Sequence, residues 1–322
     1  MILVTGGCGY IGSHIVKELS EAGEEVVVFD NLSQGKQSVL LHNEELIVGD
    51  ICDRGSLDNV FKTHNIEVVI HLAALVNAAE SVEKADLYKA VNDQGSRNVW
   101  ELANSAGVKH FLYASSAAVY GTPVSRDPIL ETAPLKPSNP YGATKLAGET
   151  NLLESLSDDA NFLIFRFFNV GGAESEGRLG QSNESRAIMQ RLFAASIGET
   201  DTITISGHDY DTPDGTVVRD FIHVEDIALA FALGLDYLRK GKDSQIINLG
   251  SGETHTIGEV IKEVEIVTGK KTPIVYGPRI KGDISYSRAD IGLAEKILGW
   301  EPAYTLRLIV RDGWNSYVKR NA

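Results

Sequence analysis

A tyrosine and a lysine four positions apart are the residues of this chain whose types and spacing could do chemistry. They lie in NPYGATKLAGE (139–149), where Asn139 is a favoured helix N-cap and Pro140 suits the first helical position. Because residues i and i+4 share one face of a helix, Tyr141 and Lys145 are expected one turn apart on the same side. A phenol has an ordinary pKa of about 10, so a tyrosine acting as a base near neutral pH needs an adjacent positive charge. The spacing therefore predicts that Lys145 keeps Tyr141 ionisable.

The first half of the chain alternates short apolar runs with helical patterns, and these elements must position the pair. The runs are ILVT (2–5), EVVVFD (25–30), VVIHLAA (68–74), KHFLYASS (109–116) and FLIFRFFNV (162–170). Near-continuous apolar strands separated by helices predict an α/β fold with a doubly wound, mostly parallel sheet of the Rossmann type. Ser116 then ends a strand at the carboxyl edge of the sheet, where such folds bind ligands. Its hydroxyl group is expected to hydrogen-bond the reacting oxygen.

After Asn169 this pattern breaks. Residues 171–187 are rich in Gly, Ser, Glu and Arg and are expected to form a loop over a site, whereas 220–250 again contains a strand, an apolar helix and a strand. We therefore predict a dinucleotide-binding domain over residues 1–170, to which 220–250 returns. Residues 171–219 and 251–322 are predicted to form a smaller, partly interleaved C-terminal substrate domain.

The glycine-rich turn TGGCGYIGSH (5–14) follows a strand and opens a helix, which is the context in which such a motif binds phosphate. Gly6, Gly9 and Gly12 allow a tight turn whose backbone amides approach a pyrophosphate at the helix N-terminus. Asp30 ends the second strand and would accept both ribose hydroxyl groups of an adenosine. Because the same carboxylate would repel a 2′-phosphate, NAD is favoured over NADP. Asp50 follows the third strand, where an acid can face the adenine.

Composition excludes several classes of partner and compartment. The 322 residues carry a net charge of −14, which argues against binding to a nucleic acid or to an anionic membrane surface. The two cysteines, Cys8 and Cys52, lie far apart without metal-ligand spacing, which predicts a reducing compartment and no metal site. The start MILVTGG has no basic segment, and the apolar runs are too short to span a bilayer. We therefore expect a cytoplasmic protein.

Taken together, the motifs resemble the extended short-chain dehydrogenase/reductase family, and within it the UDP-glucose (UDP-galactose) 4-epimerases. The resemblance is carried by TGGCGYIGSH (5–14), DNLS (30–33), GDI (49–51), HLAA (71–74), SSAAVYG (115–121), NPYGATK (139–145), RFFN (166–169), RDFIHVEDIA (219–228), NLGSG (248–252) and LGW (298–300). It implies bound NAD, a serine–tyrosine–lysine site and a nucleotide-sugar held between the two domains. It also implies an epimerase that inverts C4 of UDP-glucose/UDP-galactose, or of an N-acetylated or related analogue, through a transient 4-keto intermediate.

Two alanines narrow the reaction within this family. Sugar-nucleotide dehydratases and decarboxylases of the family usually place an acid directly after the serine or threonine of the site. Here the corresponding positions are Ala117 and Ala118, which cannot transfer protons. The chemistry is therefore expected to stay at one carbinol carbon, which is oxidised and then reduced from the other face.

The resemblance further implies which residues form the site. Ser116, Tyr141 and Lys145 would be catalytic. Contacts to NAD are implied for Gly6, Gly9, Tyr10, Ile11, Gly12, Asp30, Asn31, Asp50, Ile51, Leu72, Ala73, Ala74, Asn92, Tyr141, Lys145 and Phe168. Contacts to the substrate are implied for Ser116, Tyr141, Asn169, Arg219, Asp283 and Ser287. Ser287 stands where many relatives have a bulky tyrosine, which predicts room for an N-acetylhexosamine.

Other positions depart from the best-known 4-epimerases. Ala187 stands where these often carry Asn or His, and Ile280 stands where they usually carry an arginine for the diphosphate. Arg279, Lys281 or Arg186 would then have to replace that arginine. A homodimer through the helices near 85–105 and 140–156 is implied by the resemblance alone.

Two other functions stay open at this point. The chain could be another nucleotide-sugar oxidoreductase of the same family (a dehydrogenase, reductase or dehydratase), and a dehydrogenase would accumulate NADH where an epimerase does not. It could also be a protein that senses NAD without chemistry, although a sensor needs none of Ser116, Tyr141 and Lys145. His71 and His223 lie in apolar runs and are expected to pack or to cap backbone groups.

Overall fold

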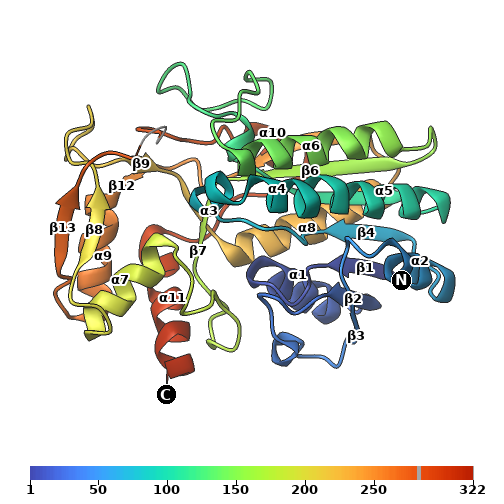
Figure 1. Cartoon of the computed structure of the whole chain (residues 1–322), viewed down its shortest axis with the longest axis horizontal. Coiled ribbons are helices and arrows are strands. Elements are labelled where there is room, and N and C mark those ends of the chain that lie inside the picture. Colours follow the sequence, from blue (N-terminus) through green and yellow to red (C-terminus); the bar gives the residue numbers. More distant parts are fainter. Residues whose placement is uncertain (281–283, 322) are drawn as a thin grey trace.

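A seven-stranded parallel sheet forms the centre of the protein (Figure 1). The computed structural model describes residues 1–280 and 284–321. The strand order is β3-β2-β1-β4-β5-β6-β11, and every neighbouring pair is parallel. The strands are β1 (Ile2–Thr5), β2 (Val26–Asp30), β3 (Glu45–Val48), β4 (Val68–His71), β5 (His110–Ser116), β6 (Asn161–Phe167) and β11 (Gln245–Leu249). The predicted doubly wound α/β fold is therefore confirmed.

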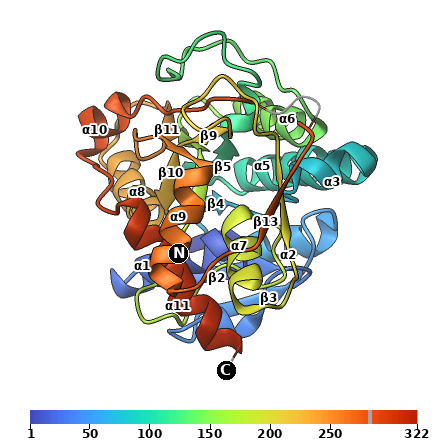
Figure 2. The same cartoon turned by 90° about the vertical axis from the view of Figure 1, so that its left-hand side faces the viewer.

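Helices cover both faces of this sheet, because each strand sends alternate side chains to opposite sides. In β1, Ile2 and Val4 face one core and Leu3 faces the other. Figure 2 shows the first face covered by α1 (Tyr10–Glu21), α8 (Val224–Arg239) and α10 (Gly292–Leu298), and the second by α2 (Arg54–Thr63), α5 (Ser96–Ser105) and α6 (Pro140–Ser155). A strand buried on both sides is apolar at every position, which explains the continuous runs in the sequence.

The apolar run 162–170, expected as one strand, forms two strands. β6 ends at Phe167 within the large sheet, and β7 (Asn169–Gly171) then pairs with β10 (Phe221–His223). Phe168 lies between them, and its N–H donates to the carbonyl of Leu249 at 3.0 Å. The change of partner depends on β10 and β11, which are distant in sequence. The run itself therefore holds no signal for it.

Residues 220–250 lead the chain back to the large sheet. β10 runs into α8, which packs on α1, and β11 follows as the edge strand beside β6. Trp300 and the nearby α10 pack into the same core, and Trp300 Nε1 donates to the carbonyl of Asp226 at 2.8 Å. The chain after residue 250 is therefore shared between the large sheet and the smaller unit.

The smaller unit has its own core. Figure 1 shows α7 (Ile188–Ile197), α9 (Ile257–Thr268) and α11 (Leu306–Asn321) beside the parallel pair of β8 (Ile203–Ser206) and β13 (Ile274–Gly277). Phe193, Val260 and Ile309 are fully buried among these elements. β9 (Val218–Arg219) and β12 (His255–Thr256) form a short antiparallel pair. In the chain, β9 comes just before β10, and β12 comes just before α9. None of the helices in the described residues is long and apolar enough to cross a membrane.

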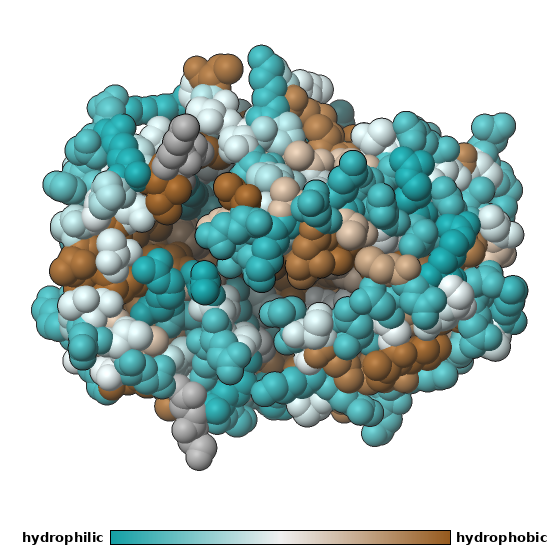
Figure 3. All heavy atoms as spheres, in the orientation of Figure 1, coloured by the Kyte–Doolittle hydropathy of each residue, from teal (hydrophilic) through white to brown (hydrophobic). Residues whose placement is uncertain are grey.

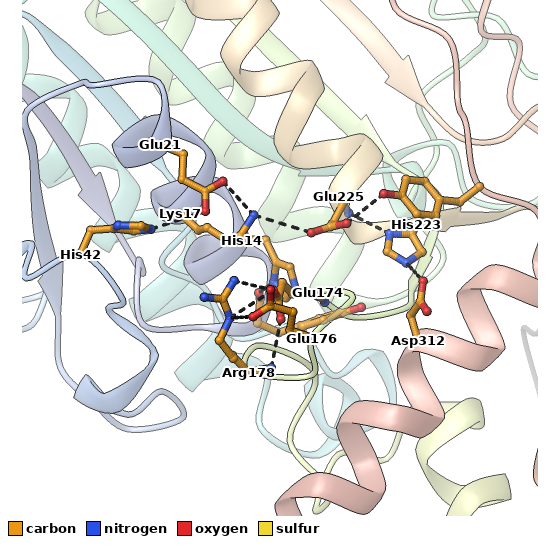
Figure 4. Close-up of polar contacts among 12 residues, drawn as sticks. His14, Lys17, Glu21, His42, Glu174, Glu176, Arg178, His223, Glu225 and Asp312 are labelled. Atoms are coloured by element: carbon orange, nitrogen blue, oxygen red, sulfur yellow. Dashed lines mark hydrogen bonds and ion pairs between the residues drawn. The ribbon is translucent and has the colours of Figure 1, made fainter.

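Buried polar contacts join the smaller unit to the start of α1 (Figure 4). The Tyr10 hydroxyl group donates to the carbonyl of Gly172 at 2.7 Å, and His14 Nε2 accepts the N–H of Glu174 at 3.1 Å. Burial lowers the pKa of His14 to about 4, so the ring is neutral and can accept. Leu179 is fully buried as well. The segment 171–187 is largely a loop, as its composition suggested, and its first part, residues 171–174, is buried between the two units.

Both histidines in the apolar runs have the structural roles that were expected. His223 Nδ1 accepts the N–H of Glu225 at 3.1 Å, which caps α8, and its ring stacks on Tyr304 with centroids 3.9 Å apart (Figure 4). His71 Nδ1 lies 2.6 Å from the Thr5 hydroxyl oxygen. Burial, followed by the charge of a nearby lysine, lowers the pKa of His71 to about 3. His71 is therefore a neutral packing residue.

Helix α6 lies close to β5, and two glycines permit this approach. A Cβ atom on Gly148 would lie 2.2 Å from the Tyr113 hydroxyl oxygen, and one on Gly142 would lie 2.5 Å from the carbonyl oxygen of Ala118. The helix begins as predicted, because the Asn139 side chain accepts the N–H of Gly142 at 2.8 Å. The sheet and α6 are thus brought together at the place where Tyr141 and Lys145 leave the helix.

Gly148→Ala should destabilise the protein, although alanine is the better helix former. Its methyl group has no room against the buried Tyr113 ring, and overpacking of a core costs about 1–3 kcal/mol of unfolding free energy. Gly55→Ala on α2 is the control. A Cβ atom there would lie 3.5 Å from Asp53 Oδ1, an ordinary contact, and the gain in helix propensity is up to about 1 kcal/mol. Denaturant unfolding measures both changes. Equal stability of Gly148→Ala and the wild type would contradict the close approach.

Candidate active site

Ser116, Tyr141 and Lys145 meet at the carboxyl end of β5. Ser116 is the last residue of this strand, and its side chain forms a hydrogen bond with that of Tyr141 on α6. Ser116 Oγ also accepts the N–H of Ala118 at 3.2 Å, which holds the hydroxyl group in place. The structure therefore brings together the serine and the tyrosine that the sequence assigned to one site.

The Lys145 ammonium group points into the protein and not toward solvent. Lys145 is only 3% exposed, and its Nζ donates to the carbonyl of Ala114 at 2.8 Å. The same atom lies 5.2 Å from the ring centroid of Tyr113. Burial lowers the pKa of Lys145 to about 7, and the negative charge of Glu149 opposes this shift. The lysine is thus fixed at the end of β5, one helical turn from Tyr141.

The charge state of Tyr141 differs from the expectation drawn from its spacing. Burial raises the pKa of Tyr141 above its ordinary value, and the hydrogen bond with Ser116 offsets only part of this. Burial also disfavours the charged form of Lys145. Because desolvation acts on both groups, the protein's own residues leave Tyr141 a protonated phenol rather than lowering its pKa.

The glycine-rich turn has the geometry of a phosphate loop. Gly6 has a φ of +76°, and a Cβ atom there would lie 2.5 Å from the N atom of Ala73. A Cβ atom on Gly12 would lie 2.2 Å from the carbonyl oxygen of Gly6, so α1 reaches the turn only with glycine at this position. Gly9 is the N-cap of α1 and, as a glycine, has no side chain that could cap the first turn. The N–H groups of Gly6, Cys8 and Gly9 already have acceptors within the protein. The amides left to face an anion are therefore those of the first turn of α1.

A groove runs from this turn past the ends of β2 and β4. It is lined by nine of the residues predicted to contact NAD, namely Gly6, Gly9, Asp30, Asn31, Asp50, Ile51, Leu72, Ala73 and Ala74. The Asp30 carboxylate accepts the N–H groups of Cys8 at 3.0 Å and Leu32 at 2.8 Å, which fixes it at the end of β2. Glycine amides at one end and a carboxylate further along fit the pyrophosphate and the adenosine ribose of a dinucleotide.

The Asp50 carboxylate at the edge of this groove is held by two hydrogen bonds. Cys52 N–H donates to it at 2.8 Å and Asn31 Nδ2 donates at 2.9 Å. Burial alone would raise the pKa of Asp50, but these hydrogen bonds hold it below its ordinary value. Asp50 is therefore an ionised acceptor beside the region where the adenine was expected.

Two residues predicted to contact the cofactor have side chains that are hydrogen-bonded within the protein. Asn92 lies in a π-helical segment (Lys89–Gly95) between α4 (Ala85–Tyr88) and α5. Its Oδ1 accepts the N–H of Leu75 at 2.8 Å, and its Nδ2 donates to the carbonyl of Leu75 at 2.9 Å and to Thr144 at 3.2 Å. Asn92 thus fastens the wall of the groove to α6. The Tyr10 side chain is turned away to Gly172, and Tyr10 and Ile11 are not among the residues that line the groove.

Asn169 and Ser287, from distant parts of the sequence, are both hydrogen-bonded to the segment that contains Arg219. The N–H of Asn169 donates to the carbonyl of Asp220 at 3.0 Å, and the N–H of Ser287 donates to the carbonyl of Val218 at 3.1 Å. Arg219 lies between these two acceptors in the chain, in β9. The three predicted substrate residues are therefore neighbours along one short strand.

Phe168 is buried in a small core with Val119, Tyr120 and Ala289, at the same end of the sheet. Asp283, which was also predicted to contact the substrate, lies outside the described residues, as does Lys281. Arg279 already has a partner, because its Nε donates to Asp209 Oδ1 at 2.7 Å. Arg186 is exposed and lies two residues before the start of α7.

Asp220 organises the substrate side, and sequence reasoning missed it. Its buried carboxylate accepts the N–H groups of Ser251 at 2.6 Å, Gly252 at 3.1 Å and Ala289 at 3.0 Å. A Cβ atom on Gly250 would lie 2.6 Å from this carboxylate. The only local signal is an acid next to Arg219, which does not distinguish a buried carboxylate from an exposed one. Only the fold shows that Asp220 points inward to the glycine-rich turn after β11.

Comparisons with known proteins place this geometry in a family. Residues 2–250 match the model of the NAD dependent epimerase/dehydratase family. The UDP-glucose 4-epimerase of Halalkalibacterium halodurans is 40% identical, over 98% of this chain and 94% of that protein. The crystal structure of UDP-glucose-4-epimerase from Stenotrophomonas maltophila with bound NAD and formylated UDP-arabinopyranose has a TM-score of 0.94 and 35% identity, covering 100% of this chain and 99% of that one.

A further solved structure is that of the UDP-Glc/GlcNAc 4-epimerase from Campylobacter jejuni, with a TM-score of 0.86 and 33% identity over 99% of each chain. These matches confirm the extended short-chain dehydrogenase/reductase resemblance, NAD as the cofactor and the assignment as a nucleotide-sugar 4-epimerase. The chain belongs to the NAD dependent epimerase/dehydratase family.

Proposed function

We propose that this protein inverts C4 of a UDP-hexose, with NAD as the bound oxidant and reductant, and that Ser116, Tyr141 and Lys145 are its catalytic residues. The observation that carries the assignment of roles is the hydrogen-bonded pair of Ser116 and Tyr141, next to the buried Lys145, at the carboxyl edge of the sheet. A phenol and a hydroxyl group in contact can act on the same alcohol oxygen.

Tyr141 takes the proton from the C4 hydroxyl group, and Ser116 donates a hydrogen bond to the same oxygen as the carbonyl forms. Burial raises the pKa of Tyr141, so the ionised phenol needs positive charge nearby. Lys145 and the oxidised nicotinamide would supply that charge. Bound NAD supplies oxidation of C4 and reduction of the 4-keto sugar. Tyr141 returns its proton to the same C4 oxygen when the carbonyl is reduced, so no net change of cofactor or proton occurs.

The NAD molecule is held by the groove described above. Gly6, Gly9 and Gly12 would surround the pyrophosphate, Asp30 would accept the adenosine ribose, and Asp50 with Ile51 would border the adenine. Their support is the shape of the glycine-rich turn and the position of the two carboxylates. Ala117 and Ala118, directly after Ser116, cannot transfer protons, which favours chemistry restricted to the oxidation and reduction of one carbon.

The nucleotide-sugar is assigned to the part of the chain formed by 171–219 and 251–322. Asn169 and Arg219 would contact the diphosphate, and Asp283 its ribose. Ser287 would face the sugar, where its small side chain leaves room for an N-acetyl group. The supporting observation is that Asn169, Arg219 and Ser287 gather at the short strand β9.

The active protein is proposed to be a cytoplasmic homodimer. Both cysteines are free thiols, as in proteins of reducing compartments. Val82, Leu87 and Leu153 are large apolar side chains that are 65%, 46% and 48% exposed on α3 (Ala78–Glu83), α4 and α6. Figure 3 shows a mostly polar surface with apolar patches, one of which lies over the region of α3 to α5. A second copy of this face would cover these side chains.

Sedimentation velocity tests the dimer. The expected mass is twice the 34.9 kDa of one chain, because a pair of apolar helix faces gains free energy when both leave water. Leu87→Asp should weaken the association, whereas Val275→Asp, at an equally exposed side chain on β13, should leave the mass unchanged. A wild-type protein that sediments as a monomer at micromolar concentration would contradict the proposal.

Tyr141→Phe should abolish the reaction without loss of the cofactor. Removing the base is expected to lower kcat by a factor of roughly 10²–10⁴, while NAD, held mainly by the groove, stays bound. C4 inversion is followed by NMR with UDP-glucose, UDP-galactose and their N-acetylated analogues, and NAD is quantified after denaturation. Tyr237→Phe on α8 is the matched control and should keep full activity. Unchanged turnover in Tyr141→Phe, or NADH that accumulates with substrate in the wild type, would sink the assignment.

Lys145→Met should make the protein more stable but less active. Burial lowers the pKa of Lys145 from 10.5 to about 7, so between these pH values the unfolded chain holds a proton that the folded chain has released. Wild-type stability therefore rises with pH in this window, and below it the full cost of the buried charge is present. The neutral methionine is expected to raise the free energy of unfolding at slightly acid pH by about 1–4 kcal/mol, an advantage that shrinks as the pH approaches 10.

Denaturant unfolding at several pH values measures this effect. Lys62→Met is the control, because Lys62 is exposed and its ion pair with Asp58 contributes little. The Lys145→Met protein should also lose at least about tenfold in kcat, since the phenol loses its neighbouring cation. A Lys145→Met protein that is less stable than the wild type at every pH would show that the ammonium group is not penalised by burial.

A further inference from the structure

A charged pair lies fully buried directly behind the site. Glu149 on α6 is 2% exposed and Arg166 on β6 is 1% exposed. Arg166 Nε donates to Glu149 Oε1 at 2.9 Å, and Arg166 Nη2 donates to Glu149 Oε2 at 2.6 Å, so the contact is bidentate. The Ser115 hydroxyl group also donates to Glu149 Oε1. One carboxylate thus connects α6 with both β5 and β6.

The partners of this carboxylate are the neighbours of the catalytic groups. Ser115 directly precedes Ser116 in β5, and Glu149 follows Lys145 by one turn on the same face of α6. Lys145 itself donates to the carbonyl of Ala114, the residue before Ser115. Two successive turns of α6 are therefore tied to neighbouring residues near the end of β5, Lys145 to Ala114 and Glu149 to Ser115.

The remaining donors of Arg166 are also satisfied within the protein. Its Nη1 donates to the Tyr120 hydroxyl group at 3.0 Å and to the carbonyl of Glu131 at 3.1 Å. Tyr120 donates in turn to Asn248 Oδ1 at 2.7 Å, in β11. The pair is thus anchored to the edge of the sheet. A buried charge with every partner in place is rigid, and a single lost partner leaves the other charge exposed to a low dielectric.

The same pair sets the charge around Lys145. The titratable groups that interact with the ammonium are Glu149 on α6, Tyr113 on β5 and His71 on β4, and Tyr141 lies one helical turn before it. Asp93 of the π-helical segment acts on Tyr113, and Arg166 lies beyond Glu149. Tyr113 and His71 are both neutral at neutral pH, because burial raises the pKa of the phenol and lowers that of the imidazole. The negative charge that favours protonated Lys145 is therefore that of Glu149.

On the basis of the proposed epimerase activity, we propose that Glu149 is a positioning residue of the reaction. Held by Ser115 and Arg166, it fixes α6 against the ends of β5 and β6. It thereby places the Lys145 ammonium and the Tyr141 phenol at Ser116, and keeps Lys145 charged while it is buried. Glu149 touches neither the substrate nor the cofactor, and acts only through these residues.

The test compares Glu149→Gln, which keeps the shape of the side chain and removes its charge, with the wild type. We expect kcat to fall by roughly tenfold to a hundredfold with little change in KM, because a small displacement of reacting groups has effects of this size. The alkaline limb of the pH profile of kcat should move down by about one pH unit, because Lys145 loses its proton more readily without the neighbouring negative charge.

A second readout does not depend on turnover. The pKa of Lys145 can be followed by NMR of protein with ¹³C-labelled lysines, and its resonance is assigned by its absence in Lys145→Met. It should titrate about one pH unit lower in Glu149→Gln than in the wild type. Glu154→Gln is the matched control, because Glu154 lies on the same helix but is exposed and pairs only loosely with Arg97 at 3.6 Å. It should keep the wild-type kcat, pH profile and Lys145 pKa.

Ser115→Ala is the second variant, in case Glu149→Gln does not fold. It deletes only the hydroxyl group that donates to Glu149, and should lower kcat by about twofold to tenfold without releasing NAD. A folded Glu149→Gln with wild-type kcat, pH profile and Lys145 pKa overturns the proposal. If that protein does not fold, wild-type kcat and Lys145 pKa in Ser115→Ala overturn it. If the wild type inverts no nucleotide-sugar, the proposed function is refuted but the role of Glu149 is not. The Lys145 pKa in the two variants then decides whether Glu149 keeps Lys145 charged.

Discussion

The approach of α6 to the end of β5 is the constraint on which the site depends. Two glycines remove the side chains that would separate the helix from the strand, and Lys145 and Glu149 then bridge them with polar contacts to Ala114 and Ser115. Without this approach Ser116 and Tyr141 could not share a hydrogen bond, since one ends a strand and the other begins a helix a loop of more than twenty residues later. The catalytic geometry is thus a property of helix–sheet packing rather than of the motif that contains Tyr141 and Lys145.

Packing this tight has an electrostatic consequence. Burial disfavours the charged forms of both Tyr141 and Lys145, so each is less ready to ionise than it would be in water. A phenolate needs positive charge nearby, which makes an oxidised nicotinamide and a protonated Lys145 joint requirements. Glu149 stabilises the latter, and Arg166 neutralises Glu149 in turn. The alternating charges along this path allow three ionisable groups to be buried where an isolated one would be costly.

The second half of the site depends on how the smaller unit is attached. Tyr10 and His14, both on the helix that opens at the glycine-rich turn, bind the backbone of Gly172 and Glu174. These two contacts therefore attach residues 172–174 to the start of α1. On the opposite side, Asp220 gathers the backbone around β9, β11 and Ala289 into one turn. This turn lies beside the segment that gathers Asn169, Arg219 and Ser287, so the proposed substrate contacts depend on how the Asp220 carboxylate holds the backbone.

The sequence by itself determined the features that depend on local pattern: the apolar parallel strands, the N-cap at Asn139, the glycine-rich turn and the i, i+4 spacing of Tyr141 and Lys145. These follow from short-range sterics and from the burial of both sheet faces, which leave a visible period in the chain. Only the tertiary structure decided the split of the run 162–170 between two sheets, the inward turn of Asp220, the packed segment around Glu174 and the use of Asn92 as a clamp. It also decided the sign of the Tyr141 pKa shift, because desolvation depends on what surrounds a group from every side, and residues that are distant in the chain supply those surroundings.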